Sequence, residues 1–258
     1  MGMIRAIRLL NDVNSGATTG ATLESILSGD AGHLGEWQQM LQFRGAARQL
    51  AASSTAMTAV IASSTAMTAV AASSTAMTAV AASSTAMTAV NANDQAVRIW
   101  MLAGTGLSYT SYANVAAVAA SSTAMTAVAA SSTARSAVYN SDTALGAIQA
   151  SSTAISALKA YAGYTVISKS ISSSATSLSL TGNAILVAYS QSSVNGAYSY
   201  AFANYRAGST ENTSTVSVNV HNTSTTVPAF TRVMALQSTA TMTDPWNGSA
   251  FIFGVIYV

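Results

Sequence analysis

The sequence contains no cysteine, two prolines and few charged side chains. Without cysteine the chain can form neither a disulfide framework nor a thiolate metal site. Charged residues make up 7% of the 258 residues, whereas an ordinary soluble domain has about 25%. Ten Lys and Arg residues against eight Asp and Glu residues leave a net charge of +2. This charge is too small for the clustered basic surface that binding to nucleic acid requires.

Long apolar runs are also missing. No stretch of about 18 apolar residues is free of Ser and Thr clusters, which argues against insertion into a membrane. The first residues, MGMIRAIRLLNDVNSG, lack the apolar region of a signal peptide. Hydrophobic residues nevertheless make up 50% of the chain and its mean hydropathy is +0.37. The composition is therefore not that of a disordered protein.

A ten-residue repeat dominates the middle of the sequence. AASSTAMTAV occupies residues 51–60 and recurs three times, once with Ile in its first position, through residue 90. None of these forty residues is charged, Gly or Pro. Weaker copies extend the array over residues 44–160, with an insertion near residues 101–110. The array indicates one regular architecture repeated along the chain.

Each repeat predicts a short helix. Ala and Met favour helix over strand, and the Ser-Ser pair stands where an N-cap belongs. In one unbroken helix, ten residues at 100° each would move the apolar stripe about 80° out of register at every repeat. We therefore expect helices of about seven residues, each capped by the next Ser-Ser pair, in a zigzag or stacked rod. A strained continuous coiled coil is the alternative.

The apolar residues of the repeats are expected to form the core of an oligomer. One Met, one Val and a few Ala per repeat are too few to offset the ordering of ten residues within one chain. Copies of the chain are therefore expected to cover them, and a parallel homotrimer suits one apolar stripe per chain. The predicted oligomer core comprises Met57, Val60, Met67, Val70, Met77, Val80, Met87, Val90, Met125, Val128, Leu145, Ile148, Ile155 and Leu158.

Residues 1–43 differ from the repeats and hold much of the charge. A short helix is expected at Ala21–Leu27, and Asp30 is placed to cap a second helix that continues into the repeats. The second helix carries an apolar face, which is the predicted attachment surface. Its residues are Leu34, Trp37, Met40 and Leu41.

Residues 161–258 follow a β pattern. β-branched and aromatic residues alternate with polar ones, and Ser, Asn, Gly and Thr separate the runs. The expected strands lie within residues 178–190, 197–205, 214–222, 230–236 and 250–258. The predicted fold class is α + β, an elongated fibrous homotrimer. It has an N-terminal helical docking region (1–43), a short-helix repeat shaft (44–160) and a C-terminal antiparallel β-sandwich head (161–258).

The predicted head is better suited to binding than to catalysis. Its acids, Glu211 and Asp244, stand in turn-like sequence, and its histidine, His221, has no acid beside it. Neither a glycosidase carboxylate pair nor a catalytic triad is indicated, and the sequence points to no metal or cofactor. Tyr, Trp, Asn and Ser side chains suit stacking on sugar rings. The predicted receptor-binding residues are Trp246, Asp244, Asn247, Tyr198 and Tyr200.

This organisation resembles a tail fibre of a tailed bacteriophage. The S-S-T-A-M-T-A-V array, for instance Ser53–Val60 and Ser121–Val128, is similar to Ala/Ser-rich repeats of phage tail proteins, as is TLESILSGDAGHLGEWQQMLQFRGAARQLAAS before it. The resemblance implies a homotrimeric structural protein of the virion tail, assembled in the host cytoplasm. It further implies that the N-terminal end joins phage tail or baseplate proteins. The C-terminal head would bind a bacterial surface glycan or protein during host adsorption, without enzymatic activity.

Other functions remain as alternatives. The chain is short for a host-range fibre, which leaves an accessory structural fibre without receptor binding. An ice-binding Ala/Thr-repeat protein is disfavoured because a ten-residue period scatters Thr55, Thr65 and Thr75 around a helix. A bacterial trimeric surface adhesin would need a signal peptide, and a glycan-cleaving enzyme would need a carboxylate pair.

Overall fold

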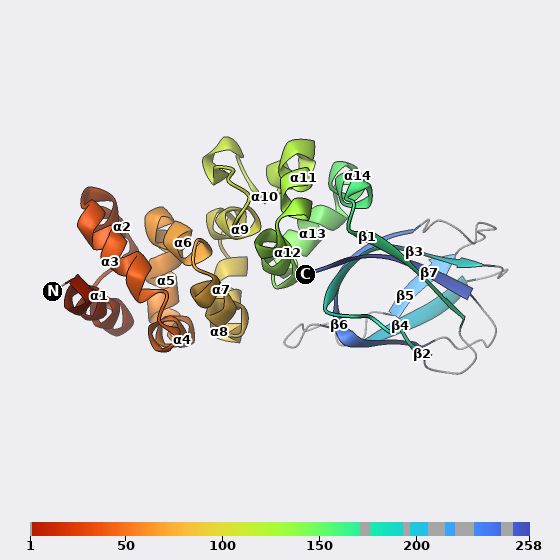
Figure 1. Ribbon diagram of the computed structural model, residues 1–258, viewed down its shortest axis with the longest axis horizontal. Coiled ribbons are helices and arrows are strands. Elements are labelled where there is room, and N and C mark those ends of the chain that lie inside the picture. The colour runs from red at the N-terminus through yellow and green to blue at the C-terminus, as the bar shows by residue number, and fades with distance from the viewer. Residues whose placement is uncertain (1, 171–175, 193–196, 206–214, 220–229, 244–249) are drawn as a thin grey trace. The chain divides into compact units, whose positions relative to one another are not determined.

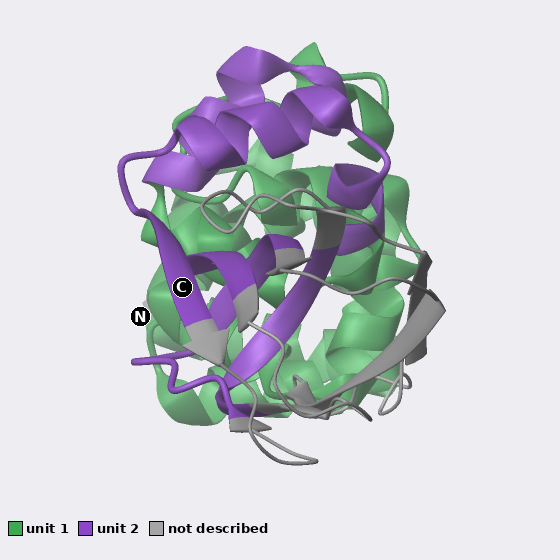
Figure 2. Ribbon diagram, turned by 90° about the vertical axis from the view of Figure 1, so that its right-hand side faces the viewer, with its two compact units in different colours: residues 1–118, 131–144 green, residues 119–130, 145–258 purple. Residues whose placement is uncertain are grey.

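The computed structural model describes residues 2–170, 176–192, 197–205, 215–219, 230–243 and 250–258 (Figure 1). For some strand residues, including all of β4 and β5, it describes the backbone alone. Contacts divide the chain into two compact units, residues 1–118 with 131–144, and residues 119–130 with 145–258 (Figure 2). Each unit has its own internal packing.

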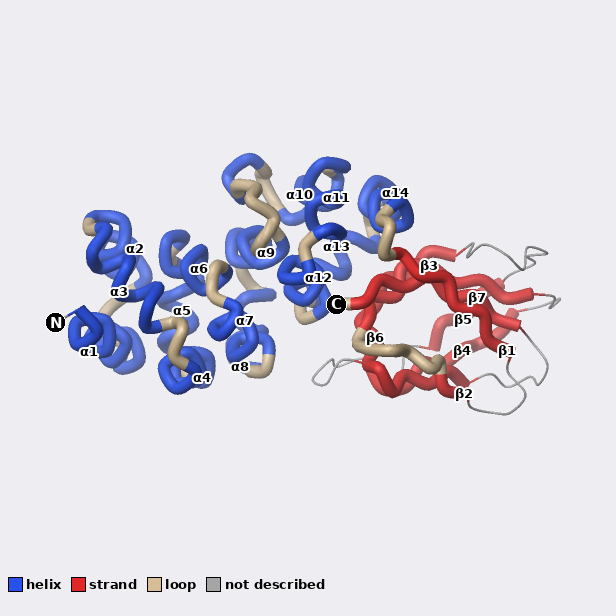
Figure 3. The backbone as a smooth tube through the Cα atoms, in the orientation of Figure 1, coloured by secondary structure: helices blue, strands red, loops and turns tan. Residues whose placement is uncertain are grey.

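From residue 2 to residue 160 the chain is a succession of short helices (Figure 3). They are α1 (Gly2–Ser15), α2 (Gly20–Gly29), α3 (Ala31–Met40), α4 (Arg44–Ala52), α5 (Ser54–Ala62), α6 (Ser64–Ala71), α7 (Ser74–Ala81), α8 (Ser84–Asn91), α9 (Asp94–Met101), α10 (Val115–Ala120), α11 (Ser122–Ala130), α12 (Ser132–Tyr139), α13 (Asp142–Gln149) and α14 (Ser152–Ala160). A 3-10 turn, η1 (Tyr109–Ser111), lies between α9 and α10.

The first serine of each Ser-Ser pair separates one helix from the next. Ser73 Oγ accepts the backbone N–H of Ala76 at 3.2 Å, and the backbone of Ser73 is extended, with φ −105° and ψ 112°. The same bond recurs at Ser53, Ser63, Ser83, Ser121, Ser131, Ser141 and Ser151, and Asn93 makes it where the serine is replaced. The short-helix prediction is confirmed. The continuous coiled coil is wrong, because each cap interrupts the helical hydrogen-bond ladder.

Successive helices turn sharply and stack on helices three places along the chain. α5 and α6 meet at a bend of 106°, so three to four such bends turn the chain through a full circle. No single helix in the described chain is long and apolar enough to span a membrane. α5 and α6 reach that length and composition only when they are taken together as a bent pair. In the first unit α5 contacts α2 and α8, α6 contacts α3 and α9, and α7 contacts α4; in the second, α11 contacts α14. Within the first unit the helices thus form a solenoid with three helices per turn.

The apolar stripe of the repeats is buried within the single chain. The fourteen predicted core side chains, from Met57 to Leu158, are at most 8% exposed, the largest value being that of Met87. The expectation that only neighbouring copies could cover this stripe was wrong. Three helices in one turn bring their apolar faces together, and the turns on either side close the core above and below.

The N-terminal helices agree with the sequence in part. The helix expected at Ala21–Leu27 is present as α2, and Asp30 caps α3 by accepting the backbone N–H of Gly32 at 2.7 Å. The expectation that this helix continues into the repeats was wrong, because α3 ends at Met40 and α4 begins at Arg44. α1 was not predicted. α1 and α2 contact α5, so the region packs on the repeats as further helices of the same unit.

The strands that follow α14 form one antiparallel sheet in the described chain. They are β1 (Tyr164–Ser170), β2 (Thr176–Ser177), β3 (Ala184–Ser192), β4 (Ala197–Tyr205), β5 (Thr215–Asn219), β6 (Phe230–Thr243) and β7 (Ala250–Tyr257). Their order is β1-β7-β3-β6-β4-β5, and β2 pairs with β6. The α + β class is confirmed, but a single sheet replaces the two sheets of the predicted sandwich.

One long strand explains why two sheets do not separate. β6 has 14 residues, and Ala235 pairs with Ile185 of β3 while Met242 pairs with Phe202 of β4. Irregular pairing at residues 186–188 of β3 and 203–205 of β4 allows the sheet to curve. One face of the sheet encloses a core that includes Leu186, Leu236 and Phe253. α14 contacts β1 and β3, and the Gln149 side chain accepts the backbone N–H of Val233 at 2.5 Å.

Candidate functional site

The insertion between α9 and α10 is the one place in the described array where the repeat is interrupted by irregular chain. It begins at Gly104, whose φ of +69° is a left-handed conformation that favours glycine. Eight extra residues, near 101–110, were expected here from the sequence. An interruption of a solenoid is a common place for a binding surface, because it adds side chains without disturbing the stacked turns.

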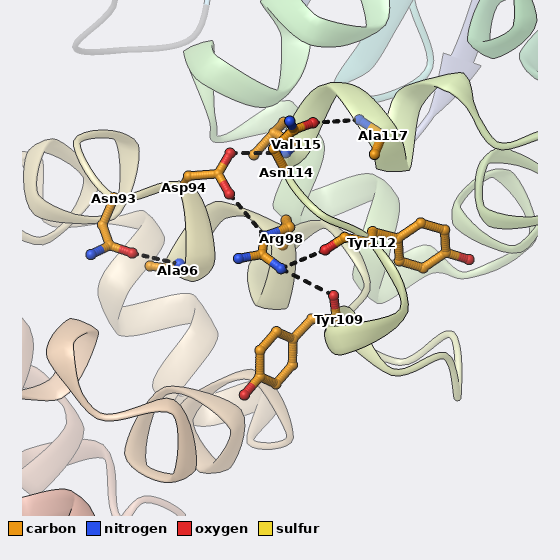
Figure 4. Close-up of polar contacts among 9 residues, drawn as sticks. All are labelled: Asn93, Asp94, Ala96, Arg98, Tyr109, Tyr112, Asn114, Val115 and Ala117. Carbon is orange, nitrogen blue, oxygen red and sulfur yellow. Dashed lines mark hydrogen bonds and ion pairs between the residues drawn. The ribbon is translucent and has the colours of Figure 1, made fainter.

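Arg98 of α9 holds the insertion against the solenoid (Figure 4). Its Nη1 donates hydrogen bonds to the backbone carbonyls of Tyr109 at 3.2 Å and Tyr112 at 2.6 Å. Its Nε pairs with Asp94 at 2.8 Å, one helical turn earlier. The guanidinium carbon also lies 5.8 Å from the centre of the Tyr109 ring, within the range of a cation–π contact. One half-buried cation therefore fixes both ends of the segment that carries the two tyrosines.

Asp94 connects the insertion to the next helix. While Oδ2 pairs with Arg98, Oδ1 accepts the backbone N–H of Val115, the first residue of α10, at 2.9 Å. Asn114 then caps α10 by accepting the N–H of Ala117 at 2.8 Å. Figure 4 shows these contacts as a continuous chain of polar groups from α9 to α10.

A small pocket of 200 Å³ adjoins the anchored tyrosine. Tyr109 forms one wall, and Gln38 of α3 and Thr68 of α6 supply an amide and a hydroxyl. A ring beside an amide and hydroxyls is suited to a small hydroxylated molecule such as a sugar. The pocket is therefore a candidate binding site on the described part of the chain.

Close to this pocket, a carboxylate is bound at the N-terminus of α6. Glu24 of α2 accepts hydrogen bonds from Ser63 Oγ at 2.6 Å, Thr65 N–H at 2.9 Å, Thr65 Oγ1 at 2.7 Å and Ser64 Oγ at 3.2 Å. Burial by itself raises the pKa of Glu24, but these hydrogen bonds outweigh it and hold the pKa below its usual range. The Ser-Ser-Thr segment at the start of α6 therefore binds a carboxylate.

The predicted receptor-binding residues fall into two groups. Trp246, Asp244 and Asn247 lie outside the described residues. Tyr198 and Tyr200 lie in β4, where their backbones pair with Val218 and Val216 of β5, and their side chains are outside the description. The two tyrosines share one face of the strand by alternation. Their role in receptor binding stays a prediction.

The predicted attachment residues are largely inaccessible. Trp37, Met40 and Leu41 are buried, with exposed fractions of 0%, 1% and 0%, and Leu34 is half-buried beside the Tyr109 pocket. The prediction that they present a docking face was wrong, because α3 turns this face toward α1, α2 and α6. The large apolar side chains that the N-terminal helices do expose are Ile4 and Ile7 of α1, at 59% and 46%.

Titratable groups are sparse in the described chain. His33 Nδ1 lies 2.8 Å from Asp30 Oδ2 at the start of α3. The hydrogen bond from the backbone N–H of Gly32 lowers the pKa of Asp30. Among the residues described, no three His, Asp or Glu side chains lie close enough to hold a metal ion.

Sequence reasoning missed Arg98, Tyr109 and Glu24. The insertion was visible in the sequence because it breaks the ten-residue period. Arg98, just before it, could have been identified as a residue that contacts the insertion. Glu24 carried no such signal, because its partner Thr65 lies forty-one residues later.

No protein-family model matches the sequence. No curated protein matches it either.

Proposed function

We propose that this protein is a structural component of a bacteriophage tail, a tail fibre that joins the virion by its N-terminal end and adsorbs to the host surface through its C-terminal β unit. The observation that carries this proposal is the direct passage from a repeat scaffold to a sheet: α14 ends at Ala160 and β1 begins at Tyr164. A scaffold of near-identical units followed by a different terminal fold is typical of proteins that hold a binding unit at a distance.

The solenoid suits a structural role rather than a catalytic one. Its described repeats expose Ser, Thr and Ala, and their apolar side chains are buried. Each unit contributes the same caps and contacts, so stability accumulates from one turn to the next. A scaffold of this kind supports a fibre without supplying reactive groups.

Attachment to the virion is assigned to α1 in this proposal. Ile4 and Ile7 lie one helical turn apart and are exposed, whereas the apolar face of α3 is buried. Exposed apolar side chains on a terminal helix are suited to packing against a tail or baseplate protein. Burial of the repeat stripe does not require a homotrimer, since the stripe is covered within one chain. The homotrimer in this proposal therefore rests on the resemblance to tail fibres alone.

Adsorption tests the receptor-binding half of the proposal. Purified protein, added to host cells before the phage, should compete with adsorption, and a Trp246→Ala variant should compete less well. Wild-type protein that fails to compete, although antibodies against it label the virion tail, would favour the alternative of an accessory fibre without receptor binding.

Imaging tests the structural half. Antibody-labelled virions should carry the label on the tail, and an Ile4→Glu/Ile7→Glu variant should be absent from assembled particles while the free protein stays folded. Label confined to host cells, or incorporation of the variant at the wild-type level, would contradict the proposed attachment.

A further inference from the structure

The Glu24 contact shows what the start of a repeat helix can bind. In α6 the residues Ser63, Ser64 and Thr65 surround a carboxylate with three hydroxyls and one backbone N–H. The first N–H groups of a helix have no partner within the helix and carry a partial positive charge. The bound group is a glutamate side chain that another helix delivers.

The same three residue types begin α8, where no carboxylate is present in the described chain. Ser83 caps α8 through the N–H of Ala86 at 3.2 Å and also donates to the carbonyl of Ala51 at 2.6 Å. Ser84 and Thr85 are exposed. Thr85 occupies the position in α8 that Thr65 occupies in α6, so its N–H and hydroxyl are available to a ligand.

The neighbouring helix explains why this second site has no internal acid. α2 contacts α6, and α4 contacts α8, so both pairs join helices four places apart. Glu24 stands five residues after the N-cap of α2, and the residue five after the N-cap of α4 is Arg48. The chain therefore places a cation where the first site has its carboxylate.

Arg48 and Arg44, one helical turn earlier, line a groove of 790 Å³ formed by residues of α4, α7 and α8. Both arginines are exposed, and neither has an acidic partner among the described residues. Ser74, Thr75, Ser84 and Thr85 add hydroxyl groups to the same groove. It combines two cations, the start of α8 and several hydrogen-bond donors, with no acid in its lining.

We propose that this groove binds an acidic segment of a partner protein, with an Asp or Glu carboxylate held between Arg48 and the N-terminus of α8. Charge complementarity favours an anion. The occupant of the matching site in α6 is a glutamate side chain, which favours a protein over a free ion or a sugar acid. The volume of the groove exceeds that of one carboxylate, so Arg44 contacts a second acidic side chain of the same segment.

Titration of the full chain with a fluorescein-labelled oligoglutamate peptide tests this site by fluorescence anisotropy. The wild type should bind, and binding should weaken as salt is added. An Arg44→Gln/Arg48→Gln variant should bind at least about tenfold more weakly, as expected for the loss of charge-assisted hydrogen bonds. Arg8→Gln, which removes an exposed arginine of α1 outside the groove, is the matched control and should bind as the wild type does.

A second variant separates the helix start from the arginines. Ser84→Ala/Thr85→Val keeps both cations and removes two hydroxyls, and it should also weaken binding. In amide NMR spectra the peptide should shift the Ser84 and Thr85 signals. Equal binding by the arginine variant and the wild type, or shifts confined to other residues, would overturn the proposal. Tighter binding of polyglucuronate or inorganic phosphate than of oligoglutamate would overturn its assignment to a protein partner.

Discussion

Ser73 Oγ donates a 3.0 Å hydrogen bond to the carbonyl of Leu41, thirty-two residues earlier, while it accepts the N–H of Ala76. Ser83 makes the same pair of contacts with Ala51 and Ala86, and Ser151 with Ala119 and Ala154. A hydroxyl is both donor and acceptor, so one atom caps a helix and joins it to the preceding turn. Aspartate can supply the cap but not the second bond.

Replacement of Ser73 tests this double role. Ser73→Ala removes a helix cap, which costs about 1 kcal/mol. It also leaves the carbonyl of Leu41 without its partner, which costs about 1–3 kcal/mol more. Urea unfolding should therefore show a loss of about 2 kcal/mol or more. Ser74→Ala, at the exposed neighbour, should lie within about 0.5 kcal/mol of the wild type. Equal losses in the two variants would contradict the role of Ser73.

Glu24 should make stability depend on pH. Its pKa is lowered in the folded protein from an ordinary value of 4.5, so the unfolded chain binds the proton more readily. The stabilisation is complete above the unfolded pKa and is lost as the pH falls through the folded pKa. The free energy of unfolding should therefore decrease on acidification below about pH 4.5.

Glu24→Gln provides the comparison for that experiment. The variant should be less stable than the wild type near neutral pH, and the difference should shrink in acid. An acidic limb that is identical in variant and wild type would show that other groups cause it.

Met67 tests whether the repeat core belongs to one chain. Met67→Ala removes a side chain that is 0% exposed and should cost about 2–5 kcal/mol. Thr68→Ala, at an exposed position of the same helix, is the control. The difference in free energy of unfolding between Met67→Ala and the wild type should be the same at every protein concentration, and the variant should keep the oligomeric state of the wild type, because Met67 packs inside its own chain.

Arg98 should protect the insertion from proteolysis. Arg98→Ala removes two hydrogen bonds to backbone carbonyls and an ion pair. A loss of about 2 kcal/mol in local stability corresponds to cleavage about thirtyfold faster when opening is at equilibrium. Chymotrypsin should therefore cut after Leu107, Tyr109 or Tyr112 much sooner than in the wild type. An unchanged cleavage rate would show that the insertion is held by other contacts.

The local features of the helices were predictable, because their causes lie within a few residues. Asp30 and the Ser-Ser pairs were expected at caps from side-chain type and position, and Asp30 and Ser73 both accept the bonds that a cap requires. These cap bonds span three residues or fewer, so the sequence displays them directly. The period of ten indicated short helices because a continuous helix would move the apolar stripe out of register at every repeat.

The three-dimensional arrangement was not predictable in the same way. Trp37 was expected on a docking face, yet it is buried, because the sequence shows that a face is apolar but not what covers it. The same was true of the apolar stripe at Met57 and Val60, because the sequence does not show whether a partner chain or another turn of the same chain covers it. The bend at each cap decides between them, and the composition of a repeat does not encode its angle.

The number of helices per turn also limits how such a chain can change in length. Helices three places apart lie on one another, so thirty residues return the chain to its starting direction. Recombination between near-identical units that adds or deletes three of them preserves the direction in which the last helix leaves, whereas a change of one unit rotates everything downstream by about a third of a turn. Growth or shortening by whole turns is therefore the change that leaves the orientation of both ends unaltered.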